Sequence, residues 1–226
     1  MAAGMDPLRA ATDKAMMTRC IELSRMAAGE GEYPFGTVIA LDGRIVAEAV
    51  NRTIREGDVT RHAEIIALSS AQKALGRPTL ARATLYSNIE PCAMCCYCIR
   101  EAWIGRVVYA LSSPVMGGMS KWNILRDSHL SGCVPIFGPP PEIIRGMLLA
   151  EAQKAWRDWN PLAWELVKLR GVLTAPKDQG DTVTVLPAQG RSLWHHAIFT
   201  LAWLISKHKR GVPETGKPGR EDWSAS

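Results

Sequence analysis

Four of the six cysteines in this 226-residue chain fall within seven positions, from Cys92 to Cys98. A secreted domain held together by disulfides spreads its cysteines between separate loops, so this crowding is not typical of one. In a reducing compartment, clustered cysteines favour metal binding or catalysis. The chain must therefore fold so that several sulfur atoms come together, and other segments must complete the site.

Two short motifs place reactive side chains at the predicted starts of two helices. Residues 62–64 read His-Ala-Glu, and residues 91–95 read Pro-Cys-Ala-Met-Cys. Residues three apart share a helix face, with Cβ atoms roughly 5–6 Å apart, so Cys92 and Cys95 can reach one ion. We expect Cys92 in the first helical turn, where free N–H groups and the helix dipole stabilise a thiolate.

These donors are typical of a catalytic zinc site. Two thiolates and the imidazole of His62 leave the fourth tetrahedral position open for a water, which zinc acidifies to a pKa of roughly 7. Attack on an amino-substituted ring carbon also needs a group that moves protons. Glu64 lies two residues after a ligand and can take this role without binding the metal.

The two motifs resemble the signature of the zinc-dependent cytidine/deoxycytidylate deaminase-like superfamily. The chain is similar to the branch that holds guanine deaminases, fungal cytosine deaminases and tRNA adenosine deaminases. The resemblance runs from about Thr12 to Trp159 and includes Asn51, residues 58–64 and the Thr-Leu-Tyr of residues 84–86.

The resemblance implies one zinc ion per chain, held by His62, Cys92 and Cys95. A closed structural zinc site is the alternative, and it needs a fourth protein ligand. Cys96, one turn after Cys92, is also conceivable as a substitute ligand. Candidates for the fourth ligand are Cys96, Cys98, His129 and Cys133.

The resemblance also implies roles for three residues around the metal. Glu64 would be the general acid and base, Asn51 would hydrogen-bond the substrate, and the backbone amide of Ala63 would contact a substrate carbonyl or ring nitrogen. Family members commonly read Asp-Pro-Thr-Ala before the histidine, whereas Val59 and Arg61 replace the proline and alanine here.

Alternation of strands and helices after a hairpin at Asp42-Gly43 predicts an α/β fold. We expect a three-layer α/β/α arrangement, with a mixed sheet of about five strands and helices on both faces. The predicted strands are 34–41, 44–50, 83–89, 106–110 and 133–137, joined by a polar loop at 51–58, and the predicted helices are 12–29, 61–75, 91–103 and 142–159.

Composition changes after about residue 171, which divides the chain into a deaminase domain, 1–171, and an extension, 172–226. Residues 175–190 read as a linker with a short strand candidate at 182–186. Residues 192–206 are an apolar helix candidate, which we expect to pack on protein rather than lie on a membrane surface. A polar tail follows.

The chain carries a net charge of +5, which permits nucleic-acid binding without indicating it. No apolar run reaches the roughly 18 residues of a membrane span. Residues 1–17 lack the apolar core of a signal peptide, so we expect a cytoplasmic protein.

Two substrates compete. The tRNA enzymes usually carry an Asp/Lys/Gly-rich stretch where residues 111–118 read Leu-Ser-Ser-Pro-Val-Met-Gly-Gly, and charge returns only at Lys121 and Arg126. We therefore prefer a small amino-substituted nucleobase of the guanine or cytosine type, its nucleoside or a related heterocycle over adenosine in tRNA. An inactive binding or scaffold protein is the third reading, against which the intact Glu64 argues. By resemblance we expect a homodimer.

Two groups of side chains are candidates for the walls of the pocket. Those in the long segment 111–132 are expected to be packing or surface residues. Those near the end of the last core helix are possible caps of the pocket. The first group is Trp122, Asn123, Asp127 and His129, and the second is Asp158, Trp159 and Trp164.

Overall fold

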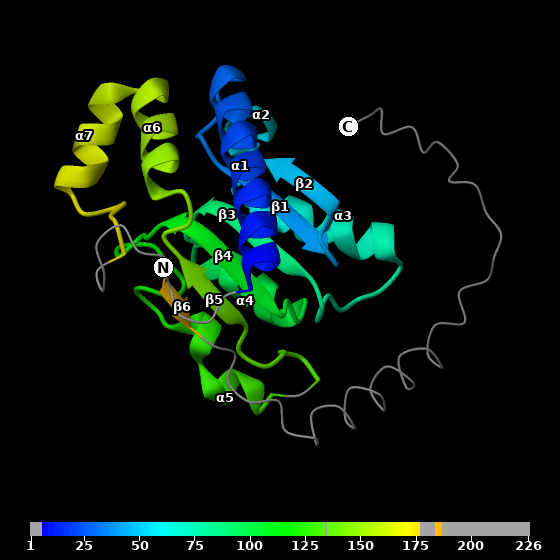
Figure 1. The fold of residues 1–226 in the computed structure, drawn as a ribbon. Coiled ribbons are helices and arrows are strands. Elements are labelled where there is room, and N and C mark those ends of the chain that lie inside the picture. The colour runs from blue at the N-terminus through cyan, green and yellow to red at the C-terminus, as the bar shows by residue number, and fades with distance from the viewer. Residues whose placement is uncertain (1–5, 134, 177–183, 187–226) are drawn as a thin grey trace, which may run out of the picture. The chain divides into compact units, whose positions relative to one another are not determined.

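The computed structural model describes residues 6–133, 135–176 and 184–186. These residues contain one mixed sheet in the order β2-β1-β3-β4-β5-β6 (Figure 1). The strands are β1 (Gly36–Leu41), β2 (Arg44–Val50), β3 (Thr84–Ile89), β4 (Arg106–Leu111), β5 (Glu142–Arg145) and β6 (Thr184–Leu186). The helices are α1 (Pro7–Gly29), α2 (Thr53–Glu56), α3 (Ala63–Leu75), α4 (Ala93–Glu101), the 3-10 turn η1 (Ile124–Arg126), α5 (Ser128–Ser131), α6 (Leu149–Trp159) and α7 (Pro161–Leu169).

The sheet begins with the predicted hairpin. Asp42 and Gly43 both have positive φ, as a tight two-residue turn between antiparallel strands requires. β1 also pairs antiparallel with β3, whereas β3, β4 and β5 run parallel and β6 closes the edge antiparallel to β5. The parallel centre follows from the crossover helix α4 between β3 and β4.

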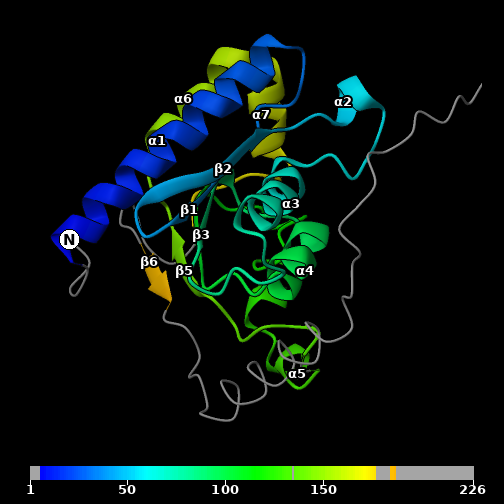
Figure 2. The same cartoon turned by 90° about the vertical axis from the view of Figure 1, so that its right-hand side faces the viewer.

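Helices cover both faces of the sheet (Figure 2). α1 and α6 pack on one face, and α3 and α4 pack on the other. The central strands are buried on both sides: Tyr86 and Val108 face the α1 layer, while Leu85 and Val107 face the α3 layer. This arrangement confirms the three-layer α/β/α prediction, with six strands in place of about five.

Two predictions after β4 were wrong. The described residues of 133–137, which leave out 134, form no strand, and β5 is instead Glu142–Arg145, at the start of the segment predicted as helix 142–159. Ile143 and Ile144 are buried on opposite faces of the sheet. Such a short apolar run has no periodicity that separates strand from helix, so pairing with β4 decided its state. The helix begins only at Leu149, after a left-handed turn that includes Leu148.

Other boundaries also shifted. The loop predicted at 51–58 contains the short helix α2, and the long segment 111–132 contains η1 and α5. Part of the strand candidate at 182–186 is present as β6. The apolar candidate at 192–206 lies outside the described residues. In the described part of the chain, no helix has the length and apolarity to cross a membrane.

Residues just beyond 171 contact the core of the deaminase domain. Leu173 is 2% exposed, and the backbones of Ser112 and Thr174 exchange hydrogen bonds of 3.0 and 2.9 Å. The division of the chain at 171/172 stays a prediction.

Candidate active site

The candidate site residues meet at one edge of the sheet. β1 begins at this edge after Phe35, and the antiparallel β2 ends there before Asn51. β3 and β4 end at the same edge, where Ile89 pairs with Leu111. The carboxyl ends of parallel strands are where α/β proteins form their ligand sites, because the loops that follow the strands diverge there.

His62, Cys92 and Cys95 present three donor atoms to a common point. The Cys92 and Cys95 sulfurs are 3.6 Å apart, and His62 Nδ1 lies 3.5 and 3.4 Å from them. Zinc bonds tetrahedrally at about 2.3 Å to sulfur and about 2.0–2.1 Å to nitrogen, which spaces such donors roughly 3.5–3.8 Å apart. The donor triangle therefore fits one zinc ion.

The backbone around these ligands differs from the prediction. His62 and Cys92 are the N-cap residues of α3 and α4 with extended backbone, and neither lies inside the first turn. Neither cap side chain hydrogen-bonds its own helix, and Cys95 comes from the first turn of α4. This geometry lets a histidine and a cysteine from different helices approach the same ion.

No fourth ligand joins the three among the residues that the structure describes. The buried Cys96 thiol instead donates a hydrogen bond to the Pro91 carbonyl over 3.3 Å. All six cysteines are free, and Cys133 is exposed. The donor set is thus that of an open catalytic site rather than a closed structural one.

The site favours a thiolate at Cys92. Its pKa is lowered to about 4, because the adjacent Cys95 sulfur hydrogen-bonds it and His62 adds a further hydrogen bond, which together outweigh burial. The same contact with Cys92, together with burial, raises the pKa of Cys95. A thiolate is the form of cysteine that binds metal.

Glu64 comes from the first turn of α3 and lies against the metal ligands. Its side chain is buried, and its Oε2 lies 3.6 Å from Cys95 Sγ while its Oε1 lies 3.4 Å from Ser87 Oγ. Burial, and then the nearby Cys92 charge, raise the pKa of Glu64. A carboxyl group with a raised pKa is suited to accept and return protons near neutral pH.

A cavity of about 490 Å³ opens beside Glu64, His62 and Cys92. Its far wall consists of Tyr33, Phe35, Trp156 and Trp159, whose ring centroids are 5.4–6.3 Å apart in tilted or edge-on contacts. α7 and the segment after it close the remaining side through Ala163, Val167, Val172 and Leu173.

Only part of this wall was predicted. Of the three possible caps near the end of the last core helix, Trp159 lines the cavity. Trp164 is buried in the core, and Asp158 forms a surface ion pair with Lys154. The four side chains considered in segment 111–132 do not line the cavity. The aromatic positions 33 and 35, between α1 and β1, and 156, on α6, were missed because the two segments are far apart in the chain and no local pattern connects them.

The predicted substrate residues lie as follows. Asn51 lines the cavity and is 2% exposed. Ala63 is fully buried and is not among the residues that line the cavity. As the first residue of α3, Ala63 has a backbone N–H without a partner within the helix.

Glu90 is a buried carboxylate that sequence reasoning missed. It follows β3, lines the cavity and accepts hydrogen bonds from the amides of Ser113, Met119 and Ser120 over 2.7, 3.0 and 2.6 Å. These bonds fix the loop that carries Met116 to the cavity. A glutamate directly before the Pro-Cys motif was the one available signal.

The fold and the donor set together are those expected of a zinc-dependent deaminase, and comparison with known proteins agrees. The family model "Cytidine and deoxycytidylate deaminase zinc-binding region" matches residues 10–111. A tRNA-specific adenosine deaminase of Agrobacterium fabrum is 43% identical over 136 residues, 60% of this chain and 86% of the relative. A probable cytosine deaminase of Schizosaccharomyces pombe is 33% identical over 126 residues, 55% of this chain and 72% of the relative.

A solved structure from work on A-to-I editing by tRNA:A34 deaminases superimposes on this chain with a TM-score of 0.54 and 32% sequence identity. The match covers 62% of this chain and 98% of the solved one. Some curated relatives are much longer, and this chain spans 24% of the length of one of them. The chain belongs to the cytidine and deoxycytidylate deaminase family, whose members are zinc-dependent hydrolases.

Proposed function

We propose that the chain deaminates a small nucleobase or nucleoside of the guanine or cytosine type, converting it to the oxo form with release of ammonia. One observation carries the proposal: His62 and Cys92 of the donor triangle line a single cavity together with Glu64 and four aromatic rings. A cavity of about 490 Å³ lies within the roughly 300–1,000 Å³ typical of small-molecule sites.

His62, Cys92 and Cys95 would hold one zinc ion, which supplies a nucleophile by lowering the pKa of a water to about 7. Glu64 Oε2 contacts a ligand sulfur, so we assign the proton transfers to this oxygen. It takes one proton from water and delivers it to a ring nitrogen. The water oxygen bonds to the carbon that carries the amino group. Glu64 then moves the second water proton to the amino nitrogen, the C–N bond breaks, ammonia leaves and the carbon keeps the oxygen as a carbonyl.

The remaining residues orient the ring. The Asn51 side chain, which lines the cavity, supplies a hydrogen bond to its polar edge, and the aromatic wall packs against the planar heterocycle. The amide of Ala63, directly after the ligand His62, is assigned a second hydrogen bond. The carbon that carries the amino group is thereby held beside Glu64.

The lining of the cavity supports a small substrate. α7 and residues 172–173 cover one side, and the loop held by Glu90 covers another. That loop carries no charged side chain before Lys121. An RNA loop needs splayed bases stacked on accessible aromatic rings, together with phosphate contacts. In this wall Trp156 is 5% exposed, and Tyr33, at 46%, is the ring most open to solvent.

Adenosine in a tRNA anticodon loop is the second candidate. The 43% identity to a protein named tRNA-specific adenosine deaminase favours it. The two candidates share the metal, Glu64 and the reaction, so only the substrate distinguishes them.

The test is to measure bound zinc and ammonia release together, on guanine, cytosine, adenine, their nucleosides, related triazines and pterins, and a tRNA anticodon stem-loop. Release from a base or nucleoside is the expected result. Release from the stem-loop alone would replace the substrate with tRNA, while bound zinc without any release would favour the scaffold alternative.

A cytoplasmic location and a homodimer stay predictions of this proposal. Six free cysteines and a thiolate metal site suit a reducing compartment. Exposed apolar side chains on and near α4, among them Tyr97, Trp122 and Ile136, offer a surface for association. Gel filtration with light scattering measures the mass directly.

A further inference from the structure

Glu32 lies behind the substrate residue Asn51, between α1 and β1, and is 1% exposed. Its carboxylate accepts hydrogen bonds from the backbone amides of Ile54 and Arg55 over 3.2 and 2.6 Å. It also accepts one from Asn51 Nδ2 over 2.9 Å. Burial opposes the charge of Glu32, but these hydrogen bonds, that of Arg55 first, lower its pKa below the ordinary value.

An ionised carboxylate can only accept hydrogen bonds. The Asn51 amide must therefore turn its NH₂ group toward Glu32, because the opposite orientation would set two oxygens against each other. The second N–H of the same group donates to Thr53 Oγ1 over 2.8 Å. Both amide hydrogens are thus used inside the protein.

With both N–H groups engaged, Asn51 Oδ1 is the polar atom of this side chain that is left for a ligand. No donor among the described residues hydrogen-bonds it, and Asn51 lines the cavity. We propose that Glu32 is a positioning residue that locks Asn51 as a hydrogen-bond acceptor. The substrate must then present an N–H or O–H donor at this edge. This inference rests on the proposed function and adds a requirement on the substrate.

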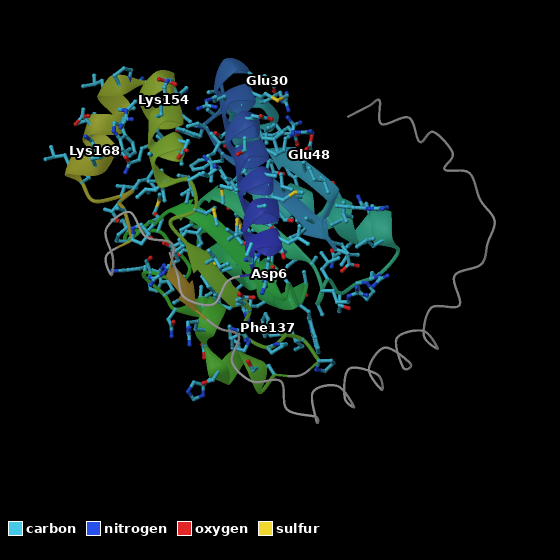
Figure 3. The ribbon with its side chains drawn as sticks, viewed as in Figure 1. Asp6, Glu30, Glu48, Phe137, Lys154 and Lys168 are labelled. Atoms are coloured by element: carbon cyan, nitrogen blue, oxygen red, sulfur yellow. The ribbon has the colours of Figure 1, made fainter. Side chains whose placement is uncertain are left out.

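Glu32→Gln tests the lock, because a glutamine amide can also donate and so permits Asn51 to turn over. For the best substrate of the panel above, we expect KM to rise about tenfold while kcat stays within about threefold, as loss of one oriented hydrogen bond predicts. The matched control is Glu30→Gln. Glu30 lies at the end of α1 (Figure 3), is exposed, and pairs with Arg55 on the surface.

A double-mutant cycle separates positioning from general support of the fold. If Glu32 acts through Asn51, Glu32→Gln added to Asn51→Ala should change KM less than about twofold. Full additivity of the two effects would overturn the proposal, as would a wild-type KM in Glu32→Gln.

Ligand binding provides a readout that does not depend on turnover. Trp156 and Trp159 line the cavity, so the quenching of tryptophan fluorescence by the oxo products, xanthine and uracil, reports their Kd. We expect Glu32→Gln to weaken product binding about tenfold with an unchanged melting temperature, and an unchanged Kd would contradict the lock. Absence of all turnover in the wild type, with Glu32-dependent product binding retained, would refute the proposed function alone.

Discussion

Glu64 Oε2 lies 3.6 Å from Cys95 Sγ, so the predicted proton carrier on α3 contacts a predicted metal ligand on α4. The two residues are 31 positions apart in the chain. Their contact depends on the side-by-side packing of the two helices on one face of the sheet. It places the carboxyl group beside the metal position without making it a ligand.

Glu64→Gln separates proton transfer from metal binding. The amide keeps the size of the side chain but cannot move protons, so we expect ammonia release to fall by about 10²–10⁴-fold. Zinc content should remain near one ion per chain. The exposed Glu165→Gln on α7 is the control. Unchanged turnover in Glu64→Gln would contradict the assigned role.

Cys92→Ser should strip the metal. Serine lacks a thiolate, and two remaining protein ligands hold zinc weakly, so we expect zinc well below one ion per chain after dialysis. Cys98→Ser on the same helix is the matched control, because Cys98 is half-buried and outside the donor triangle. Cys96→Ser should also retain zinc, and loss of zinc in that variant would revive Cys96 as a ligand.

Removal of zinc by a chelator should abolish turnover, and added zinc should restore it. The donor triangle is built by packed helices and the sheet, so we expect far-ultraviolet circular dichroism to change little in the metal-free protein. A protein that unfolds on chelation would indicate a zinc ion that holds the fold together, as structural sites do.

Gly117→Ala should disturb the loop that reaches the cavity. A Cβ at this position would stand 2.2 Å from Glu90 Oε1 and 2.6 Å from the Ser113 carbonyl oxygen. Such overpacking costs about 1–3 kcal/mol, and the displaced loop carries Met116, so kcat/KM should fall along with stability. A Cβ at Gly29 would have no heavy atom within 4 Å, so Gly29→Ala should be neutral in the same assays.

Asp13→Ala should destabilise the fold away from the site. Asp13 and Arg106 form an ion pair that is 1% and 6% exposed, and the Tyr86 hydroxyl also donates to Asp13 over 2.7 Å. Loss of Asp13 leaves the buried Arg106 with the longer 3.4 Å contact to Glu142, so we expect the free energy of unfolding in urea to fall by about 3 kcal/mol. Asp42→Asn breaks the exposed pair with Arg82 and should cost about 0–1 kcal/mol. Similar losses in both variants would contradict this argument.

The amino-acid sequence alone predicted the metal donors and Glu64, because ligand chemistry constrains residue type and spacing within short segments. It also predicted the hairpin at Asp42-Gly43, since positive φ at both turn positions is a local requirement. The three-layer class followed from the alternation of strands and helices along the chain.

Local patterns misassigned β5. Glu142-Ile-Ile-Arg satisfies helix and strand equally well, and it became a strand because β4 offers hydrogen bonds and two helix layers bury both isoleucines. The helices predicted to begin at residues 61 and 91 begin at Ala63 and Ala93, so that His62 and Cys92 are N-cap residues. Such shifts arise because the end of a helix depends on its contacts with neighbouring segments.

The sequence by itself determined what chemistry the chain can perform, since that depends on which groups stand at fixed local spacings. Tertiary structure alone decided the shape of the cavity and the orientation of Asn51. Tyr33, Trp156 and Glu32 acquire their roles only through contacts between distant segments, and such contacts leave no periodicity in the sequence.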